Sequence, residues 1–123
     1  MKIQNLEELD TPCLILDKPL LEKNCFKARK KCLELSTILR PHIKTPKSIE
    51  IAKIALDDQI GPITVSTLNE AEYFAGAGFK DILYAVCIIP KKLKRLNFIQ
   101  QKYSCIIRIV IDSTYVAQEI LKY

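Results

Sequence analysis

The sequence has only three glycines and six prolines among its 123 residues, so it contains no flexible or low-complexity linker. A chain of this length forms at most one domain. Long apolar runs are also missing. The longest, residues 106–111, is interrupted by Arg108 and is far too short to span a bilayer. Residues 1–12 contain no apolar signal core, which predicts a cytoplasmic protein.

Paired cysteines are missing as well. The chain has an odd number of cysteines, five, and no Cys-x-x-Cys pair. This pattern favours free thiols in a reducing compartment over disulfides or a zinc site. The five residues are Cys13, Cys25, Cys32, Cys87 and Cys105.

The charge balance is basic, with 19 Lys and Arg against 14 Asp and Glu and a net charge of +5. Most of the positive residues lie on expected helix faces opposite apolar stripes. No aromatic residues are interleaved with them in a way that suggests base stacking. We therefore interpret these runs as solvated helix faces, and we expect neither nucleic acid nor a membrane as a partner.

Short apolar segments alternate with helical patterns, and repeated strand–helix units of about 20 to 25 residues are typical of a parallel sheet with right-handed crossovers. We expect an α/β protein, either a doubly wound sheet or a (β/α) barrel. No glycine-rich phosphate loop follows a strand, which argues against a dinucleotide-binding or P-loop fold. The last strand is β-branched and nearly continuous, as expected for a strand covered on both faces. The expected strands are residues 13–16, 39–44, 63–66, 81–86 and 105–111.

Capping residues predict where several helices begin. Asp17 is an expected N-cap. Thr45, with Pro46 at the first helical position, predicts a helix that runs to about residue 57. Thr67 and Glu70 have the spacing of a capping box.

The most informative segment is Leu39–Ser48, with the sequence LRPHIKTPKS. Side chains alternate along a strand, so Arg40, His42 and Lys44 are expected on one face. Three basic groups inside a barrel would be costly unless they bind an anionic group. Lys44 ends the expected strand, and barrel active sites are built at that end. The alternative is an edge strand with a solvated polar face.

The next expected strand adds two polar side chains beside this face. By alternation along the strand, Thr64 and Ser66 are expected on the same face of the sheet as the basic residues. Ile63 and Val65 are expected on the opposite face. We therefore predict that Thr64 and Ser66 lie next to His42 and contribute to the same site.

Three blocks of sequence resemble one family. The family opens with TP-x-L-x-x-D and continues with RPH-x-K followed by Thr or Met, His and Lys. The blocks in this chain are LDTPCLILD at residues 9–17, RPHIKTPKS at 40–48, and TVSTLNEAE at 64–72, which continues through 77–78 to DILYA at 81–85. In this order they resemble the D-threonine aldolase / D-serine dehydratase family, whose pyridoxal-phosphate (PLP) enzymes have an alanine-racemase-like (β/α)8 barrel followed by a β-rich domain.

The resemblance implies a site and a reaction. The family lysine that binds PLP covalently corresponds to Lys44, which is the implied catalytic residue. Arg40 and His42 would adjust the electrostatics around the cofactor, and Thr64 and Ser66 would line it. The implied substrate is a small D-amino acid, and the reaction is cleavage of a D-3-hydroxy-amino acid or dehydration of D-serine.

The sequence departs from the family pattern in two ways. Pro46 stands where the family usually has histidine, so any role of that ring is lost. By resemblance, residues 13–16 belong to the β-rich domain, which leaves only four barrel strands. The family's divalent metal (Zn or Mn) is held by a histidine and a cysteine or aspartate near the C-terminus, and these ligands are absent here.

These departures lead us to expect that residues 1–123 are the N-terminal part of the PLP-binding barrel and lack lyase activity alone. Four adjacent strands cannot close a barrel, so exposed sheet edges are expected to favour a homodimer or less specific self-association. The alternatives are a degenerate, non-catalytic half-barrel and a PLP-homeostasis protein.

Overall fold

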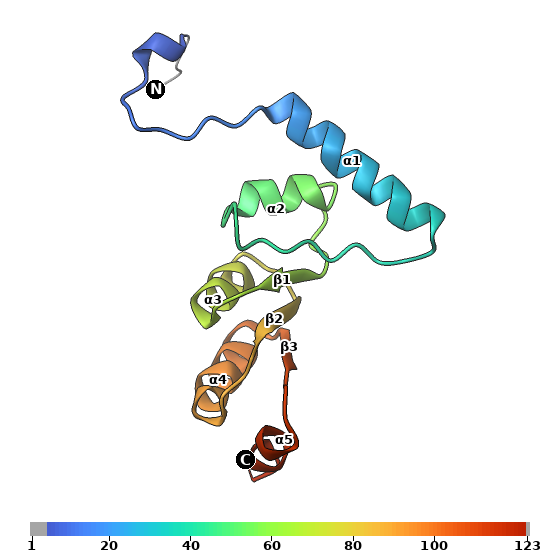
Figure 1. Cartoon of the computed structure of the whole chain (residues 1–123), viewed down its shortest axis with the longest axis vertical. Coiled ribbons are helices and arrows are strands. Elements are labelled where there is room, and N and C mark those ends of the chain that lie inside the picture. The colour runs from blue at the N-terminus through green and yellow to red at the C-terminus, as the bar shows by residue number, and fades with distance from the viewer. Residues whose placement is uncertain (1–4, 123) are drawn as a thin grey trace.

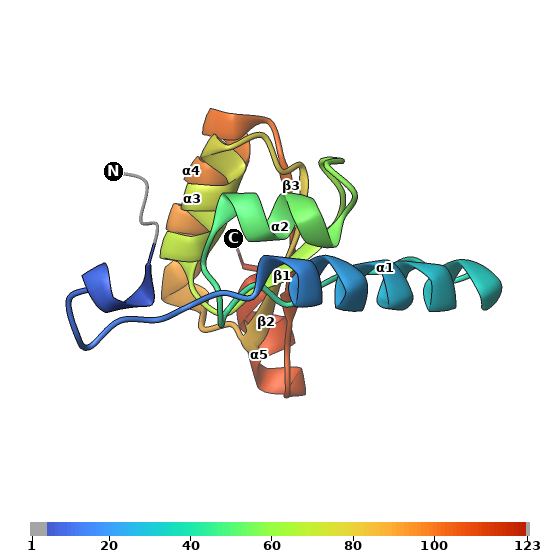
Figure 2. The ribbon, with the colours of Figure 1, turned by 90° about the horizontal axis from the view of Figure 1, so that it is seen from above.

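The computed structural model describes residues 5–122 of the chain. Its parallel sheet has the order β1 (Ile63–Val65), β2 (Asp81–Cys87) and β3 (Ile106–Val110). Helices α3 (Leu68–Gly76) and α4 (Leu93–Tyr103) cover one face of this sheet (Figure 1). Helix α1 (Lys18–Glu34) lies along α2 (Ile49–Ala55), as Figure 2 shows from above, and α5 (Thr114–Ile120) lies at the other end of the molecule. Two short 3₁₀ helices, η1 (Leu6–Glu8) and η2 (Pro90–Lys92), complete the described elements.

The hydrophobic core lies between the sheet and helices α3 and α4. Alternate strand residues point toward these helices, although in β1 the side chain on the other face, Thr64, is buried as well. A large apolar side chain that is fully buried contributes about 1.5–3 kcal/mol. The core side chains from the strands are Ile63, Val65, Ile82, Tyr84 and Ile107, and the helix side includes Leu68, Ala71, Phe74, Ala75, Leu96 and Ile99.

Two of the predicted helix starts are confirmed. The Asp17 side chain accepts a hydrogen bond from the Leu20 N–H at 2.9 Å and caps α1. Thr67 Oγ1 accepts from the Glu70 N–H at 3.1 Å and caps α3. These short-range contacts depend only on neighbouring residues, which explains why the sequence revealed them.

The expectation that the last strand is covered on both faces is wrong. Ile107 is buried under the helices, but Ile106 is 58% exposed and the Arg108 side chain is also exposed on the open face. The outer edge of β3 is partly blocked, because the Ile107 N–H donates to Gln100 Oε1 at 2.6 Å. Self-association through this edge stays a prediction.

The strand expected at residues 13–16 does not form. These residues are extended and unpaired, and the Leu14 side chain is fully exposed. A strand needs a neighbour to receive its backbone hydrogen bonds, and the described residues offer no second sheet beside this segment.

The strand expected at residues 39–44 is reduced to one bridge, in which His42 pairs in parallel with Thr64. The Ile43 N–H donates to the Thr64 carbonyl, and the Thr64 N–H donates to the Pro41 carbonyl, both at 2.9 Å. Pro41 has no N–H of its own to extend the ladder. The chain then turns, with Lys44 in the turn instead of at the end of a strand.

The helix expected from Pro46 begins three residues later, at Ile49. Ser48 is its N-cap and accepts from the Ile51 N–H at 3.2 Å. Lys47 has a φ of 45°, a left-handed conformation that interrupts a helix. Lys47 therefore belongs to the loop before α2, not to the helix's first turn.

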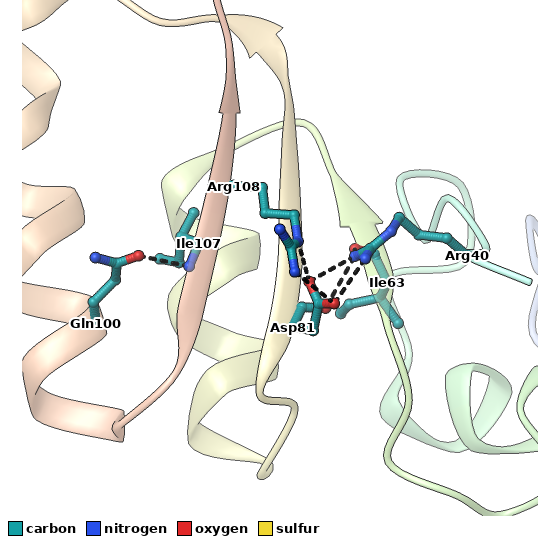
Figure 3. A network of polar contacts seen from close by, with 6 residues as sticks. All are labelled: Arg40, Ile63, Asp81, Gln100, Ile107 and Arg108. Carbon is teal, nitrogen blue, oxygen red and sulfur yellow. Dashed lines mark hydrogen bonds and ion pairs between the residues drawn. The ribbon is translucent and has the colours of Figure 1, made fainter. Parts of the chain in front are cut away.

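A cluster of charges holds the segment at residues 39–44 to the sheet (Figure 3). The Arg40 guanidinium donates to both carboxylate oxygens of Asp81, at 3.0 and 2.8 Å, and to the Ile63 carbonyl at 3.2 Å. Arg108 Nε approaches the same carboxylate at 3.0 Å. Asp81 thus joins the Arg40 segment to β2 and β3 across the open face, in a bidentate contact that fixes orientation as well as distance.

The first prediction concerns the core. Phe74 is fully buried, and its ring meets Phe79 edge to face, with 5.5 Å between the ring centroids. We expect Phe74→Ala to lower the free energy of unfolding by about 3–5 kcal/mol, because it removes buried apolar surface and leaves a cavity. The matched control is Phe98→Ala, since Phe98 is 55% exposed on α4 and its removal should change little. Urea unfolding of both variants checks this, and equal losses would contradict it.

The second prediction concerns pH. The hydrogen bonds from Arg40 lower the pKa of Asp81 from 3.8 to about 2, although partial burial opposes this shift. Because the folded-state pKa is the lower one, the stabilisation is present above 3.8 and is lost as the pH falls through about 2. Asp81→Asn should therefore cost about 1–2 kcal/mol at neutral pH, after solvent screening is allowed for, and much less at pH 2.

Unfolding by urea across this pH range is the measurement. Asp57→Asn is the control, because the Asp57 carboxylate pairs with Arg29 but is 71% exposed and should contribute little. A cost for Asp81→Asn that does not change with pH would show that the charge of Asp81 is not what holds the segment.

Candidate functional site

The predicted site residues meet where the turn at residues 43–46 lies beside the end of β1. Ile43 is 3% exposed and anchors the turn in the core, whereas His42 and Lys44 are both exposed. This separation matches the alternation predicted from the sequence. Among the described residues, the Lys44 ammonium forms no hydrogen bond or ion pair with another side chain.

The His42 ring connects the turn to β1. Its Nδ1 accepts a hydrogen bond from the Lys44 N–H at 3.3 Å, and its Nε2 lies 3.4 Å from Ser66 Oγ. Thr64 is 7% exposed and pairs with His42 through the backbone. The structure therefore brings together four of the five predicted residues: His42, Lys44, Thr64 and Ser66.

Arg40 is held apart from this group. Its guanidinium donates to Asp81 and to the Ile63 carbonyl, at the ends of β1 and β2 where these strands begin. Its observed contacts are structural, and its contribution to cofactor binding stays a prediction.

Sequence reasoning missed the two acidic groups that hold these segments. Asp81 gave no signal, because it starts a strand and finds its arginine partners only in the folded chain. Glu70 was identified only as a capping residue, and the expected capping box is altered. The Glu70 carboxylate accepts from the Ser66 N–H at 2.8 Å and pairs with Lys47 Nζ at 3.2 Å.

A separate groove of about 680 Å³ lies between α1 and the loop after α2. Phe26, Leu33, Leu39 and Leu56 give it an apolar lining, and none of the predicted site residues line it. Beside it, Arg29 joins the helices by donating to the Ile54 carbonyl at 2.7 Å. The contacts of Arg29 are those of helix packing, and the groove is therefore separate from the Lys44 site.

The described residues contain neither a candidate metal cluster nor a membrane-spanning helix. Within residues 5–122, no group of three or more His, Cys, Asp or Glu side chains is arranged to hold a metal ion. None of the helices in this part of the chain is long and apolar enough to cross a membrane.

Comparison with known proteins identifies relatives, although no protein-family model matches the chain. D-threo-3-hydroxyaspartate dehydratase from Delftia sp. is 36% identical over 115 residues, which cover 94% of this chain and 30% of that protein. D-serine dehydratase from Dictyostelium discoideum is 38% identical over 95 residues, or 73% of this chain and 24% of that protein. 3-Hydroxy-D-aspartate aldolase from Paracoccus denitrificans is 36% identical over 92 residues, which cover 72% of this chain and 24% of that protein.

Solved structures give the same result for the fold. An alanine racemase-like protein from Idiomarina loihiensis superposes with a TM-score of 0.86 at 40% identity, over 94% of this chain and 31% of that one. The Delftia dehydratase superposes with a TM-score of 0.88 at 36% identity, over 94% of this chain and 30% of that protein. These matches confirm the predicted partial α/β barrel and the predicted resemblance. The chain spans about 30% of the length of these relatives, and over that span it is similar to D-serine and D-threo-3-hydroxyaspartate dehydratases and 3-hydroxy-D-aspartate aldolases, with an alanine racemase-like fold.

Proposed function

We propose that this chain is part of a PLP-dependent lyase for D-3-hydroxy-amino acids, of the D-serine dehydratase or D-threonine aldolase type. Residues 1–123 would form the N-terminal part of its PLP-binding barrel, with Lys44 as the lysine that binds the cofactor. The observation that carries the proposal is the exposed Lys44 side chain, which has no partner among the described residues and follows the His42–Ser66 contact in a chain homologous to these enzymes.

The residues present fit the chemistry of an aldehyde cofactor. The amine of an exposed lysine can attack an aldehyde once it is deprotonated, and Ser66 and His42 supply polar groups at the end of β1 and in the turn. When bound, PLP supplies an electron sink that stabilises negative charge on the Cα of an amino acid. Lys44 Nζ would bind the cofactor and afterwards act as a base toward the Cα proton. His42 would orient the Lys44 turn through its bond to the Lys44 N–H.

The described residues do not fit a divalent metal. No cluster of His, Cys, Asp or Glu side chains within residues 5–122 offers a ligand set, so no step is assigned to Zn or Mn here. Cytoplasmic location is a further part of the proposal, supported by the five cysteines, all of which are free thiols.

A non-catalytic half-barrel is the second candidate, favoured by the open face of the sheet. Ile106 and Val110 are exposed there, and three strands with one bridged segment supply only one wall of a site. Orientation and preorganised charge supply most of an enzyme's acceleration, and both need the missing wall. The same surface would suit a PLP-homeostasis protein less well, because an open face retains a cofactor poorly.

The third prediction separates the two lysines near the site. The chain is incubated with PLP, reduced with borohydride and mapped by peptide analysis. We expect the label on Lys44, because its amine has no partner in the described structure, whereas the Lys47 ammonium pairs with Glu70 at 3.2 Å. Lys44→Ala should abolish the site-specific label and Lys47→Ala should retain it. Label on Lys47 with Lys44 unmodified would refute the assignment.

The fourth prediction concerns activity. The purified 123-residue chain, given PLP and divalent metal, should show no meaningful cleavage of D-threonine or dehydration of D-serine. Its open face does not enclose the cofactor, so reaction at Lys44 lacks orientation and charge stabilisation. Assays of both reactions, with Lys44→Ala as the control, provide the measurement. A turnover of about 10 s⁻¹, which is ordinary for an enzyme, would favour a catalytic half-barrel instead if it is lost in Lys44→Ala.

A further inference from the structure

The turn that carries Lys44 has few backbone contacts. The Lys47 N–H donates to the Ile43 carbonyl at 3.0 Å and closes the turn on itself. The Ile43 N–H, which donates to Thr64, is the last backbone group of this segment bonded to β1 among the described residues. The position of Lys44 therefore depends on side-chain contacts at both ends of the turn.

One carboxylate provides a contact at the far end. Glu70 lies in the first turn of α3, and its side chain is only 9% exposed. One of its oxygens accepts from the Ser66 N–H at 2.8 Å, and the other pairs with Lys47 Nζ at 3.2 Å. Burial raises the pKa of Glu70, but these two contacts outweigh it, so that the pKa lies below its ordinary value. Glu70 is therefore charged at neutral pH.

The same carboxylate influences the near end of the turn through Ser66 and His42. The Lys44 N–H donates to His42 Nδ1 at 3.3 Å, so Nδ1 carries no proton and the neutral ring is protonated on Nε2. That Nε2–H then faces Ser66 Oγ at 3.4 Å. Because Glu70 holds the Ser66 backbone, it also fixes the hydroxyl that this Nε2–H meets.

We propose that Glu70 is a positioning residue for Lys44, holding its turn through Lys47 on one side and through Ser66 and His42 on the other. This inference rests on the proposed role of Lys44 in binding PLP. Glu70 touches neither Lys44 nor the open face, so it acts only through these neighbours. Replacing Glu70 should therefore change two quantities, the rate at which Lys44 reacts and the tautomer of the His42 ring.

Glu70→Gln tests this directly, because it keeps the size of the side chain and removes its charge. With PLP as the probe, we expect Lys44 to be modified roughly five-fold more slowly, since the charge-assisted contact between the buried Glu70 carboxylate and the exposed Lys47 is lost. Ring ¹⁵N shifts of His42, the chain's one histidine, should at the same time move away from the Nε2–H tautomer. Lys47→Met should act in the same direction without altering α3, and Lys47→Arg should restore wild-type behaviour.

Glu72→Gln is the matched control, since Glu72 lies on the same helix but pairs with Arg95 and Lys102. It should leave both readouts unchanged. Modification of Lys44 at the wild-type rate in Glu70→Gln, or an equal effect of Glu72→Gln, would overturn the inference.

If wild-type Lys44 does not react at all, the proposed function fails. The His42 tautomer then decides alone: a change in Glu70→Gln but not in Glu72→Gln supports the positioning role, and no change rejects it.

Discussion

The burial of one face of the parallel sheet under α3 and α4 is the constraint on which the other features depend. Because side chains alternate along a strand, placing Ile63, Val65 and Tyr84 in the core sends their neighbours to the opposite face. That face carries Asp81 and Arg108, together with the polar end of β1 at Ser66. Stability and candidate chemistry thus occupy opposite sides of the same strands.

The segment that carries Lys44 joins this sheet in an unusual way. Its backbone forms a single bridge, at His42, and the buried Ile43 side chain and two charged contacts hold it further. Arg40 binds Asp81 before the bridge, and Lys47 binds Glu70 after it. Charged hydrogen bonds are directional, so these two contacts fix the orientation of a segment that lacks a ladder. The Lys44 side chain, between them in the sequence, has no hydrogen-bond or ion-pair partner among the described residues.

Much of the fold was predictable from the sequence, because the signals were local. Asp17 and Thr67 cap helices through contacts only three residues long, and alternation placed Ile43 in the core. The predicted helix start at Pro46 was wrong because Ser48 offers a better cap after the left-handed Lys47. The predicted strand at residues 13–16 failed for a different reason: a strand requires a partner that the described residues do not provide.

The sequence by itself determined the alternation of strands and helices from residue 63 onward, the resemblance to these lyases and the lysine to consider. Each of these is carried by periodicity or by a contiguous motif such as RPHIKTPKS. Only the tertiary structure decided which groups hold that lysine in place. Asp81 meets Arg40 across 41 positions of sequence, and Glu70 meets Lys47 across an intervening strand. Such charge pairs form only when the sheet brings distant segments together, so no local pattern could have indicated them.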